Sequence, residues 1–128
     1  MTVDVHFGKL ATEVDEDGVW EHAEWPGDPH EDDGTSEEHT IYSRRPIRSF
    51  SNSGFADWVE RVPEARAIAY VCYTADRVAT PIDATLLKLI KRLPAKGLPG
   101  DVDRGKWFKY WSRRAVETFG SDAIIFFS

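Results

Sequence analysis

Hydrophobic and polar residues alternate at the start of the chain. Val3, Val5 and Phe7 are separated by polar residues, and this period of two is typical of a β-strand with one buried face. Residues 15–18 (Asp-Glu-Asp-Gly) have turn chemistry, because the glycine can adopt a positive φ. Since residues 19–25 resume a strand-like run, the pattern predicts an N-terminal β-hairpin.

The middle of the chain predicts a loop, an edge strand and a helix. Residues 26–38 combine two prolines, two glycines and a dense acidic cluster, which is typical of a loop. Residues 39–50 are rich in β-forming side chains, but Pro46 and three arginines favour an edge or bulged strand. Hydrophobic residues then recur at helical spacing between the serines at 51–53 and Pro63, which predicts a short helix.

Residues 67–73 are apolar on both alternating faces, so they predict a central strand covered on both sides. We expect a second helix after Thr80, with Thr80 as its N-cap and Pro81 at its first position. It should end before the proline and glycine that follow residue 93.

A third helix is expected from about residue 104 to Phe119, capped by Asp101 or Asp103 and ended by Gly120. Residues 123–127 predict another central strand. The complete pattern therefore predicts one α+β domain over residues 1–128, in the order β-β-loop-β-α-β-α-α-β. Its sheet should have about five strands, antiparallel or mixed, with three helices packed on it.

Composition narrows the class of protein. A chain of 128 residues with 41% hydrophobic residues and five tryptophans can bury one core. No hydrophobic run approaches the length of a membrane span. The single cysteine, Cys72, excludes an intramolecular disulfide and is expected to pack in the core. We therefore expect a cytoplasmic protein that does not bind a membrane.

Charge is distributed unevenly along the sequence. Residues 1–40 contain thirteen Asp and Glu against one cation, Lys9, which gives a charge of −12. The remaining residues carry +6, so the total of −6 conceals two regions of opposite sign. The acidic third must either be neutralised within the fold, by Arg44, Arg45, Arg48 and the third helix, or meet a basic partner.

The sequence carries only weak signals for a metal site, a cofactor site or a catalytic nucleophile. The acidic third holds histidines and carboxylates in a spacing that matches no known metal signature: His22, Asp28, His30, Glu31, Asp32, Asp33 and His39. The chain has neither a glycine-rich phosphate loop nor a serine nucleophile elbow. We therefore expect no metal and no cofactor.

Binding to a basic macromolecule is the leading functional hypothesis. Small acidic inhibitors, such as toxin-neutralising immunity proteins and phage proteins that block host defence, share this size and charge. The partner would be a toxin or a complex that handles nucleic acid. A tryptophan beside the acids would anchor the interface. The predicted contact residues are Trp20, Trp25, Asp28, Glu31, Asp32, Asp33, Glu37 and Glu38.

Two alternatives remain at this stage. The first alternative is a small hydrolase or transferase. All four histidines lie in the acidic third, where neighbouring carboxylates can shift their pKa values for general acid or base catalysis, and an arginine from 44–48 would complete the site. The third helix interleaves cations with aromatics, as nucleic-acid platforms do: Lys106, Trp107, Lys109, Tyr110 and Arg113. Helical geometry instead places Trp107 and Tyr110 at the margins of a core helix, so direct binding of nucleic acid is not expected.

Overall fold

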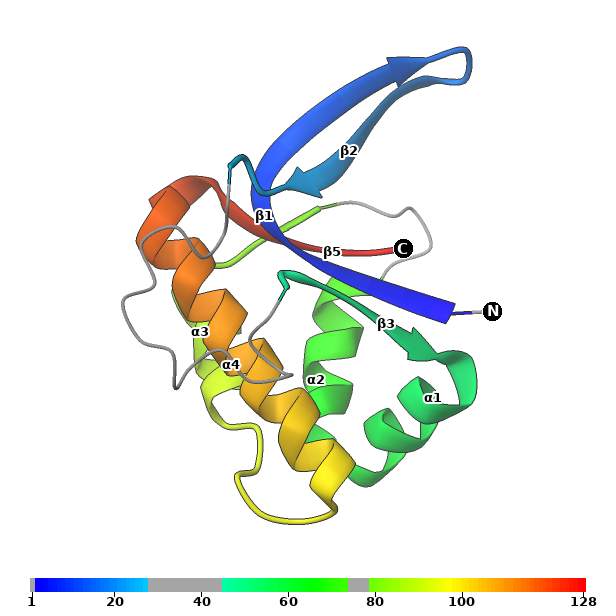
Figure 1. Ribbon diagram of the computed structural model, residues 1–128, viewed down its shortest axis with the longest axis vertical. Helices are drawn as coiled ribbons and strands as arrows, with labels where there is room; N and C mark the ends of the chain where they lie inside the picture. Colours follow the sequence, from blue (N-terminus) through cyan, green and yellow to red (C-terminus); the bar gives the residue numbers. More distant parts are fainter. Residues whose placement is uncertain (1, 28–44, 74–78) are drawn as a thin grey trace.

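A five-stranded sheet forms one layer of the molecule, and the helices lie together on one side of it (Figure 1). The computed structural model describes residues 2–27, 45–73 and 79–128. The elements in chain order are β1 (Thr2–Asp15), β2 (Gly18–Glu24), β3 (Ile47–Ser51), α1 (Asn52–Arg61), α2 (Pro63–Cys72), β4 (Thr80–Pro81), α3 (Ala84–Lys91), α4 (Pro99–Phe119), a 3₁₀ turn (Gly120–Asp122) and β5 (Ala123–Phe127). This architecture confirms the predicted α+β class.

The long strand β1 organises the sheet. Its first residues pair with β3, its middle with β5 and its outer half with β2, always antiparallel. The order is β2-β1-β5-β4, with β3 beside the start of β1. β5 is therefore central, as its apolar residues on both faces predict, and β3 is an edge strand. Residues 39–44 of the predicted edge strand lie outside the described part of the chain.

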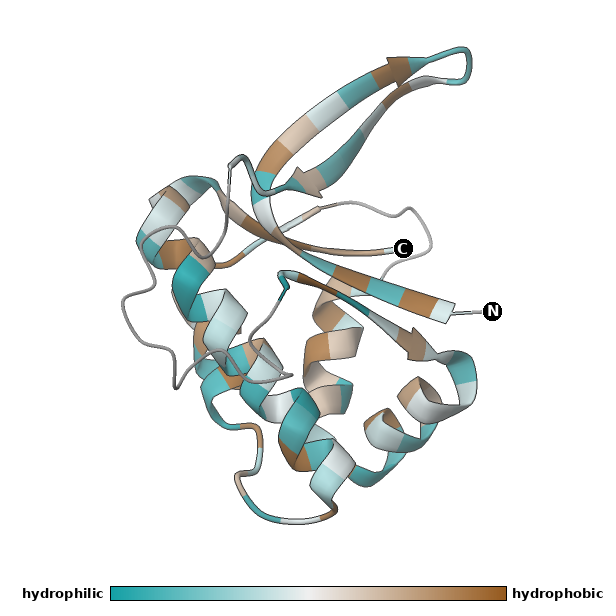
Figure 2. Cartoon of the chain, in the orientation of Figure 1, coloured by the Kyte–Doolittle hydropathy of each residue, from teal (hydrophilic) through white to brown (hydrophobic). Residues whose placement is uncertain are grey.

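The core lies between the sheet and the helices. Val3, Val5 and Phe7 are buried in it, and Figure 2 shows the alternation of hydrophobic and hydrophilic residues along this part of β1. From the helical side, Phe108 and Trp111 of α4 are wholly buried. Phe7 and Phe108 meet edge to face, with their ring centroids 5.8 Å apart, an arrangement that stabilises aromatic cores.

The predicted strand at 67–73 is wrong, because this segment forms most of helix α2. Pro63 begins the helix, and the buried residues Ala65, Ile68 and Cys72 recur at helical spacing. Tyr70 is 89% exposed, so the run is not covered on both sides. The chain consequently has four helices among the described residues, and the fourth strand of the sheet is the two-residue β4.

Two predicted helix starts also need correction. Asp83, rather than Thr80, caps α3 and accepts a hydrogen bond from the Leu86 amide, while Thr80 and Pro81 form β4. α4 begins at Pro99 and has no side-chain cap, since Asp101 already lies within its first turn. The predicted end at Gly120 is confirmed by its positive φ. No described helix is long and apolar enough to cross a membrane.

Candidate functional site

The hairpin β1–β2 extends away from the helices at its outer end (Figure 1). Its register pairs Glu13 with Trp20 and Val14 with Val19. At the base of the hairpin, a Cβ added to Gly8 would lie 2.3 Å from the carbonyl oxygen of Glu24. A glycine is therefore required at this point for β2 to join the sheet.

The outer part of the hairpin carries only negative charge. Residues 10–27 contain no lysine or arginine, and their six carboxylates are Glu13, Asp15, Glu16, Asp17, Glu21 and Glu24. Within the described residues, none of these carboxylates forms an ion pair with a lysine or arginine; Glu13 lies 3.1 Å from His22. The field of these groups is therefore directed toward solvent.

Three arginines of the body are engaged by carboxylates outside the hairpin. Arg48, one of the residues expected to neutralise the acidic third, lies 2.7 Å from Asp103. Asp101 similarly binds both Arg61 and Arg104. The carboxylates at the start of α4 thus take these guanidinium groups, and the acids of the hairpin do not.

Exposed apolar side chains lie among the hairpin acids. Val14 and Val19 form a cross-strand pair and are 78% and 70% exposed. Trp20 is 42% exposed, and its indole N–H donates to Asp15 Oδ2 at 2.9 Å. Apolar groups within a charged rim are the usual anatomy of a binding surface. We call residues 13–21 the acidic hairpin tip.

Trp25, the second predicted aromatic contact, has a different environment. Its ring meets Trp111 and Phe119 edge to face, with centroids 5.2 and 4.8 Å away. Trp25 thus attaches the end of the hairpin to α4. The other predicted contacts, Asp28, Glu31, Asp32, Asp33, Glu37 and Glu38, lie outside the described residues.

A cavity of about 610 Å³ beside the hairpin holds two of the histidines. His6 and His22 line it together with Asp15, Trp20 and Phe126. Burial lowers the pKa of His6, with Asp4 opposing this effect and His22 adding to it. No local pattern in the chain indicates this proximity, because sheet pairing brings His6 and Phe126 together from opposite ends of the sequence. Among the described residues, no group of three or more His, Cys, Asp or Glu is placed to hold a metal ion.

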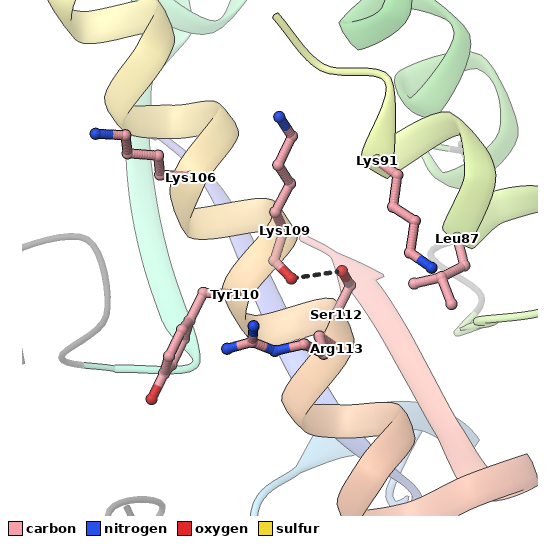
Figure 3. A pocket seen from close by; sticks show the side chains of 7 residues that line it. All are labelled: Leu87, Lys91, Lys106, Lys109, Tyr110, Ser112 and Arg113. Carbon is pink, nitrogen blue, oxygen red and sulfur yellow. Dashed lines mark hydrogen bonds between the residues drawn. The ribbon is translucent and has the colours of Figure 1, made fainter. Parts of the chain in front are cut away.

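A second concavity, which we call the basic groove, lies between α3 and α4 and measures about 390 Å³ (Figure 3). Its lining residues are Leu87, Lys91, Lys106, Lys109, Tyr110, Ser112 and Arg113. Trp107 and Tyr110, expected at the helix margins, are instead 2% and 6% exposed. Trp107 donates its indole N–H to the Arg45 carbonyl, so its ring is not available for stacking with a base.

Cys72 has the environment expected of a core residue, although it lies on a helix rather than a strand. It is 2% exposed, and burial raises the pKa of its thiol to about 12. Because the thiolate is the reactive form, the neutral Cys72 is a poor nucleophile.

Comparison with known proteins found no matching family model, no similar curated protein and no similar solved structure. The function must therefore be inferred from the geometry and charge of the described residues.

Proposed function

We propose that this chain is a non-enzymatic binding protein whose acidic hairpin tip docks on a basic site of a macromolecular partner. One observation carries the proposal. Five carboxylates of residues 13–21, with no lysine or arginine ion pair among the described residues, surround exposed apolar side chains on a hairpin that projects from the body (Figure 1).

Each part of the tip has a physical role in such an interface. The carboxylates attract a positively charged surface over long range and raise the rate of association by about 10- to 1000-fold at low salt. Val14 and Val19 supply apolar area that is lost from water on contact. The exposed indole of Trp20 is the aromatic anchor, a residue type enriched where binding energy concentrates.

The class of partner follows from this charge. Proteins that bind nucleic acid present clustered lysines and arginines to phosphate groups. A narrow acidic hairpin can occupy such a basic site and exclude its natural ligand. We therefore propose that the chain inhibits a toxin or a complex that handles nucleic acid. It would act in the cytoplasm and would not bind a membrane.

Charge reversal at the tip tests the proposal. The test variant carries Glu13→Lys, Glu16→Lys and Asp17→Lys, and the control carries the same charge change on exposed body residues, Asp57→Lys, Glu60→Lys and Asp122→Lys. Partners captured by the wild-type chain from an extract at low and high salt are identified and purified. Association rates are then measured over a range of ionic strength.

We expect the tip variant to associate at least about tenfold more slowly at low salt and to lose most of the salt dependence of its association rate. The control variant should keep the wild-type rate and its salt dependence. Equal rates for the wild type and the tip variant would refute the hairpin as the docking site. A second triple variant, Glu31→Lys, Asp32→Lys and Asp33→Lys, measures separately how much the predicted acidic loop at 26–38 contributes to the association rate.

The cavity that holds His6 and His22 supports a second candidate, a small hydrolase or transferase. A histidine whose pKa is lowered by burial stays neutral and can accept a proton. His22 lies against Glu13, an arrangement that can orient an imidazole. Turnover of ester, phosphate or phosphodiester substrates that is lost in His6→Gln and retained in the body control (Asp57→Lys, Glu60→Lys and Asp122→Lys) would favour this candidate. Absence of turnover across these classes would count against it.

A further inference from the structure

The basic groove is a second charged feature, and it lies in the helical layer rather than on the hairpin. Lys106, Lys109 and Arg113 recur at intervals of three and four residues, so they lie on one side of α4. They span about 10 Å of the helix axis. Lys91 comes from the last turn of α3, and Figure 3 shows the Lys109 side chain extending between the two helices.

The positive charges of Lys91, Lys109 and Arg113 are poorly compensated within the part of the chain that the structure describes. Among the described residues, no aspartate or glutamate lines it, and Lys91 and Lys109 form no ion pair. The carboxylate nearest to Arg113, that of Glu117, is 3.9 Å away, at the limit of an ion pair. Cations gathered around one concavity repel one another, and a bound anion would relieve this repulsion.

The groove also has an apolar part. Leu87 contributes an aliphatic side chain, and the ring of Tyr110 lies 5.4 Å from the guanidinium carbon of Arg113. A volume of about 390 Å³ lies within the range of small-molecule sites, which is roughly 300 to 1000 Å³. The site therefore fits a ligand that has both an anionic and an apolar portion.

We propose that the basic groove binds an organic phosphate of nucleotide size. The phosphates would lie against Lys91, Lys109 and Arg113, and the organic portion would pack on Leu87 and Tyr110. A phosphate carries up to two charges and three acceptor oxygens, so one group can satisfy several cations, which a single carboxylate cannot. This site goes beyond the proposed docking function, because it uses no residue of the hairpin.

Calorimetric titration with adenosine triphosphate as the probe tests the proposal. The test variant is Lys91→Gln with Lys109→Gln. The control is Lys88→Gln with Lys96→Gln, which makes the same change in charge at exposed lysines outside the lining. We expect one saturable site per chain, weakened about tenfold or more for each groove cation removed and little changed in the control.

Further probes separate the sources of binding. Adenosine triphosphate should bind more tightly than both adenosine and inorganic tripolyphosphate. Tripolyphosphate binding equally well would mean an adventitious ion only and would overturn the proposal. So would preference for a single-stranded oligonucleotide or a hexaglutamate peptide, or no saturable binding at all. The tip variant should bind the nucleotide normally, which keeps this result independent of the docking function.

Discussion

Trp20 lies on β2 and Trp25 directly follows that strand, but the two side chains have different environments, and alanine substitution separates their contributions to stability. The Trp25 ring forms two edge-to-face contacts, with Trp111 at 5.2 Å and Phe119 at 4.8 Å. Trp20 is 42% exposed, donates one hydrogen bond to Asp15, and has one tilted ring contact, with His22 at 5.2 Å. Trp25→Ala should therefore destabilise the fold, and Trp20→Ala should destabilise it much less.

The magnitudes follow from these contacts. Each edge-to-face pair contributes about 0.5 to 1.5 kcal/mol beyond burial of its area. Removal of a partly buried indole adds about 1 kcal/mol of lost burial. Trp25→Ala should thus lower the free energy of unfolding by about 2 to 4 kcal/mol and the Tm by about 10 °C for a chain of this size. Trp20→Ala removes one exposed hydrogen bond and one ring contact on the hairpin, which together should cost about 1 kcal/mol.

Urea denaturation followed by circular dichroism measures both variants against the wild-type chain. The midpoint should fall clearly for Trp25→Ala and much less for Trp20→Ala, with similar denaturant slopes. If Trp20→Ala destabilises as much as Trp25→Ala, Trp20 supports the fold and is not reserved for a partner. If neither substitution destabilises, Trp25 does not attach the hairpin to α4.

Three further predictions concern stability and reactivity. The buried Cys72 thiol, whose pKa is raised to about 12, should resist a disulfide reagent at pH 8 and react fully after unfolding; rapid reaction of the native chain would contradict its burial. Gly8→Ala should cost about 2 kcal/mol or more because its Cβ would meet the Glu24 carbonyl at 2.3 Å. Gly100→Ala in α4 should be close to neutral, because its Cβ would meet only the end of the Arg104 side chain, at 3.2 Å; equal losses of stability in thermal unfolding would contradict this difference. The folded pKa of His6 lies below its ordinary value of 6.5, so the stability present above pH 6.5 should be lost as the pH falls through the folded value. This loss should be smaller in His6→Gln, and equal pH profiles in chemical denaturation would exclude His6 as the cause.

Local patterns predicted much of the fold. The alternation of Val3, Val5 and Phe7, the turn ending in Gly18 and the apolar run at 123–127 each define an element that the structure contains. These signals are reliable because each depends on residues a few positions apart. The strand order, in contrast, depends on the pairing of β1 with β5 from the other end of the chain.

The wrong strand at 67–73 has a physical explanation. A short apolar run has no clear period, so a buried strand and a helix with a wide apolar face are indistinguishable by pattern alone. Pro63 at the first helical position was the signal that favours the helix. The exposed Tyr70 and Tyr73 could not be recognised, because exposure depends on which elements the rest of the chain places nearby.

The candidate site was predicted less completely than the fold. The excess of acids in the first forty residues is readable from composition, but the exposure of Trp20, in contrast to the packing of Trp25 on α4, is not. The engagement of Arg48 by Asp103 is not readable either, because it joins residues 55 positions apart. The same applies to the basic groove, since Lys91 and Lys109 belong to different helices.

The proposed docking function depends on the acidic hairpin tip presenting an uncompensated negative potential to solvent. Paramagnetic enhancement of amide-proton relaxation by a cationic and an anionic nitroxide of equal size measures this potential residue by residue. We expect residues 13–21 to be relaxed more strongly by the cationic probe, and the amides around Lys109 more strongly by the anionic probe. Equal enhancement of residues 13–21 by the two probes would contradict the claim.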